Sequence, residues 1–132
     1  MKWISILLVA LVAFSCKKDS GKSQFLGKWR LVAYYTGPAC GCWYQVQPMN
    51  ADILEFKVDG KYTITRAPIY SSIVCPGRYR IINVSTVGLR EECAGSNPSP
   101  EAIGTYSESL KELTIEYNYP TPDRAKYRYV KL

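Results

Sequence analysis

Short runs in which apolar and polar side chains alternate constrain the fold of this chain most. Trp29, Leu31 and Ala33 occupy alternate positions of one run, and Leu113 and Ile115 do the same in another. Successive side chains of a β-strand point to opposite faces, so this period of two indicates strands with one buried face. No segment shows a convincing helical period. The alternation therefore predicts an all-β fold.

Glycine, proline, asparagine and aspartate separate these runs, as expected for strands joined by tight turns. The predicted strands cover residues 28–35, 43–47, 53–58, 61–66, 78–82, 86–91, 104–107, 112–117 and 126–130. Asp59-Gly60 is the strongest hairpin signal, and it predicts a type I′ turn with positive φ at both residues. Because closure removes exposed strand edges, the series indicates a small antiparallel up-and-down barrel of about eight strands.

The N-terminal segment has the features of an export signal. Lys2 precedes an apolar stretch at residues 3–14, and Ser15-Cys16 is followed by polar residues. The stretch is shorter than the roughly 20 apolar residues that span a bilayer, and its length suits the apolar region of a cleaved signal peptide. The pattern resembles a bacterial lipoprotein signal peptide. An ordinary signal peptide in which Cys16 is incidental is the alternative.

This resemblance implies cleavage before Cys16 and the attachment there of several acyl chains, palmitate among them, which together anchor a protein stably. Lys17 stands where inner-membrane lipoproteins of enteric bacteria carry aspartate, so the expected location is the outer membrane, facing either the periplasm or the cell surface. The expected organisation is a signal peptide at residues 1–15, a lipidated N-terminus and flexible tether at 16–25, and one domain at 26–132.

The chain is basic, with a formal net charge of +6 at pH 7. Its basic residues are interspersed with other types, which is typical of solvated faces. Nucleic-acid binding is not expected of an exported protein, whereas weak attraction to anionic lipid or glycan is consistent with this charge. The expected partner is therefore the membrane, reached through the N-terminal lipid.

Short motifs carry a second family resemblance. Gly27-Lys28-Trp29 opens the first predicted strand, as the Gly-X-Trp motif does in lipocalins, and Arg128 lies in the last strand, where lipocalins place an arginine. Together with the segment 56–62, these motifs resemble the small lipocalin-like lipoproteins of Bacteroidota. The resemblance implies a closed barrel in which Gly27, Trp29 and Arg128 plug one end, with Arg128 stacked over Trp29 by a cation–π contact.

An even number of cysteines remains once the signal-peptide cysteine is lipidated, and in an oxidising envelope this points to disulfides with three possible connectivities. If the two strands that flank Val84 pair, their ladder places Cys75 opposite Cys93. That bridge leaves Cys40 and Cys42 to close a small ring, whereas the rival pairing joins these two to Cys75 and Cys93. A redox role or a four-cysteine zinc site is less favoured, because no helix N-terminus and no paired metal-binding spacing accompany the cysteines.

Composition gives little support for catalysis. The chain has no histidine, which removes the commonest general base and a common metal ligand. Its carboxylates, including Asp52 and Glu91, lie in turns, near strand ends or on strands, and surface solvation accounts for them. No phosphate-binding or calcium-binding loop motif is present. We therefore expect a non-catalytic protein without a metal or other cofactor.

Aromatic residues are the remaining candidates for binding. The chain has 11 tyrosines and 3 tryptophans, and a tyrosine ring combines an apolar body with a polar tip. The candidates for lining a cavity or its rim are Trp43, Tyr44, Tyr62, Tyr79, Tyr117 and Tyr127. The barrel either binds a small hydrophobic or amphipathic molecule, as the lipocalin resemblance implies, or is filled by side chains and acts as an interaction or accessory module. A cavity of a few hundred cubic ångströms lined by these residues would favour the first function.

Overall fold

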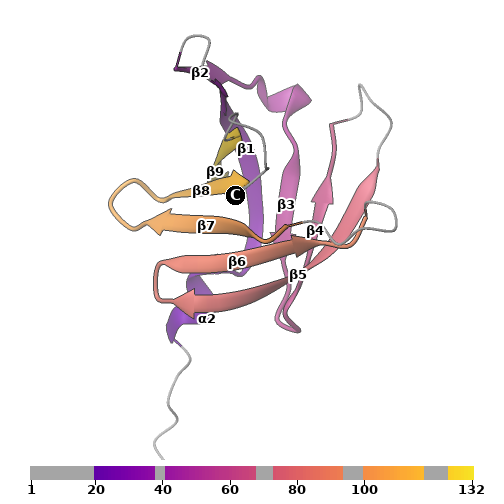
Figure 1. The fold of residues 1–132 in the computed structure, drawn as a ribbon, viewed down its shortest axis with the longest axis vertical. Helices are drawn as coiled ribbons and strands as arrows, with labels where there is room; N and C mark the ends of the chain where they lie inside the picture. Colours follow the sequence, from indigo (N-terminus) through magenta and orange to yellow (C-terminus); the bar gives the residue numbers. More distant parts are fainter. Residues whose placement is uncertain (1–19, 38–40, 68–72, 94–99, 118–124) are drawn as a thin grey trace, which may run out of the picture.

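The computed structural model describes residues 20–37, 41–67, 73–93, 100–117 and 125–132. They form one antiparallel sheet that curls round on itself, with a short helix at one end (Figure 1). Within these ranges no helix is long and apolar enough to cross a membrane. Cys16 and the predicted signal peptide lie outside the described residues.

Every predicted strand corresponds to an observed one, and most ends differ by one or two residues. Residues Ser20–Phe25, which the sequence analysis assigns to the flexible tether, form a helix. The described elements are α2 (Ser20–Phe25), β1 (Gly27–Thr36), β2 (Cys42–Gln45), the 3-10 helix η2 (Pro48–Asn50), β3 (Ile53–Phe56), β4 (Lys61–Thr65), β5 (Val74–Asn83), β6 (Thr86–Glu91), β7 (Ala102–Ser107), β8 (Glu112–Tyr117) and β9 (Ala125–Lys131).

The sheet closes into a barrel because its first strand pairs with its last. The strand order is β2-β1-β3-β4-β5-β6-β7-β8-β9, with an additional β1–β9 pairing. The ring therefore contains eight strands, β1 and β3 to β9, while β2 pairs with the second half of β1 beyond the end of β3. The β1–β9 register runs from Trp29↔Lys131 to Tyr35↔Lys126. The predicted small antiparallel barrel is confirmed.

The hairpin predicted at Asp59-Gly60 joins β3 to β4, but its turn type differs from the prediction. Gly60 has a φ of +79°, whereas Asp59 does not have a positive φ. The Lys57 N–H donates to the Lys61 carbonyl at 2.9 Å, so the loop holds three residues with glycine in the left-handed position. The Asp59 side chain accepts a hydrogen bond from the Lys61 N–H. The prediction of a type I′ turn is therefore wrong.

A bulge in β1 changes which side chains face the barrel interior. The register with β9 shifts between Leu31, which pairs with Tyr129, and Ala33, which pairs with Arg128. Leu31 and Tyr129 belong to the core cluster, and Ala33 does not, although it is buried. The predicted common face of Trp29, Leu31 and Ala33 is therefore interrupted after Leu31. A bulge of this kind adds one residue to one strand only.

Large apolar side chains fill the interior of the barrel at the end where β1 begins, the closed end. Aliphatic residues from the middle of the strands complete the packing. Protein interiors of this kind leave few voids larger than a water molecule. The largest fully buried side chains are Trp29, Tyr62, Phe25, Leu54, Ile64, Leu89, Leu113, Ile115 and Val87.

Trp29 and the helix α2 seal the closed end. Trp29 is 0% exposed, and its indole N–H donates to the Phe25 carbonyl at 2.7 Å. Phe25 is also 0% exposed, so α2 is held to the barrel by its last residue. Lys131 places its ammonium 5.4 Å from the Trp29 ring and donates to the Gln24 carbonyl. Gly27, with a φ of +103°, starts β1 directly after this contact.

Arg128 does not stack over Trp29 as the family resemblance implied. Its guanidinium carbon lies 4.1 Å from the centroid of the Trp43 ring. The reason is strand alternation: Arg128 pairs with Thr114, and the neighbouring Ile115 is fully buried, so the Arg128 side chain lies on the outer face. The cation over Trp29 is the ammonium of the last β9 residue instead, and the predicted plug is corrected to this extent.

The predicted Cys75–Cys93 disulfide is confirmed. It joins the start of β5 to the residues after β6, and the ladder between these strands pairs Tyr79 with Leu89, as the register predicted. The rival connectivity, which used both cysteines for other bridges, is therefore wrong. Cys42 is also disulfide-bonded. Its predicted partner Cys40 lies outside the described residues.

We predict that Trp29→Ala destabilises the fold by about 3–5 kcal/mol, because it removes a fully buried ring and its hydrogen bond. Trp43→Ala is the matched control, since Trp43 is only partly buried on the outer face. Urea unfolding of the oxidised variants measures both changes. Equal losses of stability in the two variants would contradict the role of Trp29 as the seal of the closed end.

Candidate functional site at the barrel mouth

The inward side chains of four strands change from apolar to polar at the end of the barrel opposite Trp29, called the mouth below. Each change continues the alternation of its strand by one more step of two residues. Arg66 follows Tyr62 and Ile64, Glu91 follows Val87 and Leu89, Tyr117 follows Leu113 and Ile115, and Asp52 precedes Leu54 and Phe56. The four polar groups therefore converge above the filled core.

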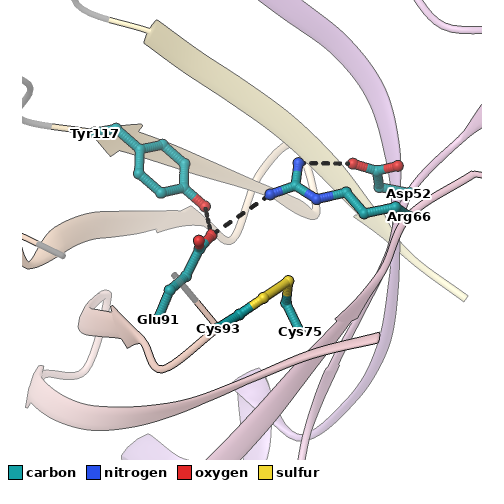
Figure 2. Close-up of a disulfide and its surroundings, with 6 residues drawn as sticks. All are labelled: Asp52, Arg66, Cys75, Glu91, Cys93 and Tyr117. Atoms are coloured by element: carbon teal, nitrogen blue, oxygen red, sulfur yellow. Dashed lines mark hydrogen bonds and ion pairs between the residues drawn. A yellow bond between two sulfur atoms is a disulfide. The ribbon is translucent and has the colours of Figure 1, made fainter. Parts of the chain in front are cut away.

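Arg66 lies between two carboxylates (Figure 2). Its Nη1 is 3.4 Å from Asp52 Oδ2, and its Nη2 is 3.8 Å from Glu91 Oε1. The Tyr117 hydroxyl donates to the same Glu91 oxygen at 3.2 Å, and the Ala67 N–H donates to Asp52 at 2.9 Å. Figure 2 also places the Cys75–Cys93 bridge beside this cluster. Arg66 is thus ion-paired with both carboxylates at the mouth.

The pKa values of Arg66 and of three inward tyrosines are raised in this part of the barrel. Partial burial opposes the charge of Arg66, yet the carboxylates of Asp52 and Glu91 raise its pKa above the usual value. Burial is the main cause that raises the pKa of Tyr62, of Tyr117 and of Tyr129 far above that of free tyrosine. Nearby carboxylates add to each of these shifts, Glu91 in all three cases. The mouth therefore holds a fixed cation and neutral hydroxyls.

A small cavity lies among these groups. It has a volume of about 70 Å³ and is lined by Arg66, Glu91, Tyr117, Tyr127 and Tyr129. Sites for small organic ligands typically measure about 300–1,000 Å³, whereas this volume suits a few water molecules. The cavity is therefore a polar recess rather than a deep apolar calyx.

A larger hollow lies outside the barrel. It has a volume of about 320 Å³ and is lined by Ile103, Thr105, Thr114, Glu116 and Lys126. These residues alternate with inward ones on three neighbouring strands, which places the hollow on the outer face of β7, β8 and β9. The proposed aromatic candidates do not line it. Its size therefore does not argue for binding inside the barrel.

The structure separates the six aromatic candidates. Tyr117 and Tyr127 line the cavity and contact each other edge to face, with ring centroids 5.4 Å apart. Tyr62 is buried in the core, and Tyr79 donates its hydroxyl to the Lys57 carbonyl near the closed end.

The two remaining candidates come from β2. Tyr44 stacks on Tyr34 at 5.4 Å, and Trp43 contacts Arg128 and Tyr35. Their strand pairs with β1 outside the ring of eight. Trp43 therefore lies on the outer face, whereas Tyr44 shares the inner face with Tyr34, which pairs with the cavity residue Tyr127.

The sequence analysis missed Arg66, Glu91, Asp52 and Tyr129 as residues of the mouth. It attributed Asp52 and Glu91 to surface solvation, but their side chains are only 16% and 15% exposed. Extending each apolar alternation by two positions would have placed these charges on the inward face. The available signal was the phase of the strands rather than the type of residue.

Comparison of the chain with protein-family models, with curated proteins and with solved structures gives no match. Among the described residues, no group of three or more histidine, cysteine, aspartate or glutamate side chains could hold a metal ion.

We predict that stability falls as the pH rises above about 10. In the unfolded chain tyrosines lose their protons near this pH, whereas the raised pKa values of Tyr62, Tyr117 and Tyr129 keep them protonated in the native state. The native state then binds more protons than the unfolded state, so the free energy of unfolding decreases with pH. Urea unfolding at a series of pH values measures the slope. Tyr117→Phe should make the slope shallower, and an unchanged slope in this variant would contradict this account.

Proposed function

We propose that this protein is a lipid-anchored, non-catalytic lipocalin-like lipoprotein of the cell envelope, with a barrel filled by side chains that serves as an interaction module. The observation that carries the proposal is the interior itself. Large apolar side chains fill the barrel from Trp29 upward, and the recess at the mouth measures about 70 Å³. Such an interior favours recognition by the surface and the mouth over storage of a ligand in a deep calyx.

The sequence of the N-terminal segment supports the anchoring. The apolar stretch at residues 3–14, followed by Ser15-Cys16 and a polar run, has the order expected of a lipoprotein signal peptide. On this proposal Cys16 carries the acyl chains, and the outer membrane is the location, as in the small lipocalin-like lipoproteins of Bacteroidota that the chain resembles. The eight-stranded closed barrel is compatible with that family.

The proposal of a non-catalytic role rests on the chemistry of the mouth. The chain has no histidine. Arg66 is paired with Asp52 and Glu91, and Tyr117 donates to Glu91. A general base needs a pKa near the working pH and a proton to abstract, and the tyrosine pKa values here are shifted away from neutrality.

A second candidate function is the binding of a small amphipathic molecule at the mouth. The recess combines the apolar rings of Tyr117 and Tyr127 with the charges of Arg66 and Glu91. A ligand there would place a polar group in the recess, because the volume of about 70 Å³ does not admit a long acyl chain. This candidate keeps the binding role implied by the lipocalin resemblance but confines it to the rim.

Native mass spectrometry of protein purified from envelopes separates the two functions. We expect the mass of the lipidated chain alone, because large apolar side chains pack the described interior and the recess at the mouth measures about 70 Å³. A small molecule that co-purifies at full occupancy would contradict this expectation. A fluorescent fatty acid titrated into the protein should likewise show no saturable binding. Saturable binding that is weakened by Tyr127→Ala, and not by the outer-face control Tyr35→Ala, would support the second function instead.

We predict that Cys16→Ser releases the protein from the membrane fraction, because the acyl chains lose their point of attachment. Mass spectrometry of the unsubstituted protein should show the added acyl mass on the residue that starts the mature chain. Lys18→Arg, in the polar run after the cleavage site, is a control that leaves Ser15 and Cys16 in place. Membrane association that is unchanged in Cys16→Ser would contradict the lipoprotein assignment.

A further inference from the structure

We propose that the closed end of the barrel docks on an anionic membrane surface through the tips of three hairpins. The hairpin turns are residues 57–60 between β3 and β4, 84–85 between β5 and β6, and 108–111 between β7 and β8. In an up-and-down barrel, turns after alternate strands lie at one end. The pair Gly27↔Phe56 places the first of these turns beside the start of β1, where α2 joins the barrel. Figure 1 shows α2 beside the β5–β6 hairpin.

Each of the three turns exposes one large apolar side chain. Val58 is 77% exposed, Val84 is 68% exposed and Leu110 is 66% exposed. Ile82, at the end of β5, and Leu132, after β9, are exposed at the same end. Turn tips usually carry small polar residues, and single exposed apolar residues need no explanation. An exposed apolar side chain on each of three neighbouring tips, in contrast, suits shallow insertion into lipid.

Lysines surround these tips. Exposed lysines occur on α2, at the ends of the first and third turns, and at the end of β9, namely Lys22, Lys57, Lys61, Lys111 and Lys131. The carboxylates of the same turns are fewer. Asp59 is 3.6 Å from Lys61 and Glu108 contacts Lys111, while Glu112, which begins β8, is 3.5 Å from Arg128. A basic rim around apolar tips matches the anionic headgroups and acyl boundary of a membrane.

The N-terminal anchor would hold this end at the bilayer, and here the inference rests on the proposed lipidation. Cys16 lies four positions before Ser20, a reach of at most about 14 Å. Phe25, the last residue of α2, is 0% exposed and fixes the helix to the closed end. The tether therefore enters the barrel at the end that carries the apolar tips. This arrangement favours the bilayer as the surface that the tips contact.

Vesicle binding without the lipid tests the tips independently of lipidation. The protein used is the chain from residue 16 with Cys16→Ser, which contains every described strand and core residue. It should co-sediment with phosphatidylcholine vesicles that contain phosphatidylglycerol, more than with pure phosphatidylcholine, and added salt should weaken the binding. The combined variant Val58→Ser, Val84→Ser, Leu110→Ser should lose affinity by about tenfold.

The matched control removes exposed apolar side chains from the mouth end. Met49→Ser, Ile73→Ser, Val74→Ser changes residues that are 79%, 53% and 55% exposed, and it should bind vesicles like the starting protein. Equal binding by the two combined variants, or no binding of the starting protein to anionic vesicles, would overturn the proposal. Self-association abolished only by the tip substitutions, without vesicle binding, would assign the tips to a second copy and would also overturn it.

The lipidated protein gives a second measurement. Reconstitution into vesicles should slow the acetylation of Lys57, Lys61 and Lys111 and leave the rate of Lys126, which lies on the outer face toward the mouth, unchanged. An equal effect of the vesicles on all four lysines would overturn the docking even where the lipid anchor is intact. Failure of lipidation itself is read separately, from the acyl mass and the Cys16→Ser fractionation. Urea midpoints of all variants verify that the tip substitutions leave the fold in place.

Discussion

The pairing of β1 with β9 is the constraint on which the rest of the structure depends. It joins residues at opposite ends of the described chain, Trp29 with Lys131 at one extreme and Tyr35 with Lys126 at the other. Loop closure of this length costs conformational entropy, and the closed interior offsets the cost by burying apolar side chains from all eight strands of the ring. Closure also builds both ends at once. At the closed end it brings the Lys131 ammonium over the Trp29 ring, and at the mouth it places Tyr34 opposite Tyr127. Without it, neither the seal nor the recess would exist.

The interior of the barrel is graded along its axis, and this gradient decides what the barrel can do. Near the closed end Phe25 and Trp29 leave no exposed surface. At the mouth the inward positions carry charges, which are tolerated in a partly buried place only when they are paired. Arg66 lies between Asp52 and Glu91 for this reason. The recess lined by Arg66 and Glu91 has a volume of about 70 Å³. The same residues that make the mouth polar therefore limit the size of anything that enters it.

The alternation of the sequence predicted the strands well, because a period of two is imposed by strand geometry and survives in each short run. It also predicted the Cys75–Cys93 bridge, since register follows once two strands and their turn are known. It failed where a local feature changed the phase. The bulge after Leu31 moves Ala33 out of phase with the core, and no residue type in that run marks it. Arg128 was assigned by family resemblance to Trp29, whereas its own position in β9 points it outward. The charges at the mouth were missed because the alternation was not followed beyond the last apolar residue.

The two ends of the barrel expose different side chains, so the molecule is chemically polar along the barrel axis. The hairpin tips of the closed end carry exposed Val58, Val84 and Leu110 beside lysines, and the tether predicted to follow Cys16 joins the barrel there through Phe25. Toward the mouth, β2 extends β1 beyond the ring and exposes Tyr44, and η2 exposes Met49. If the closed end lies on the bilayer, as proposed, these side chains and the paired charges of the recess project into the aqueous space. A filled barrel then acts as a rigid support that holds one chemically distinct end away from the membrane. An open calyx is not required for that role, because rigidity comes from close packing. On this proposal the dense interior and the lipid anchor serve the same role.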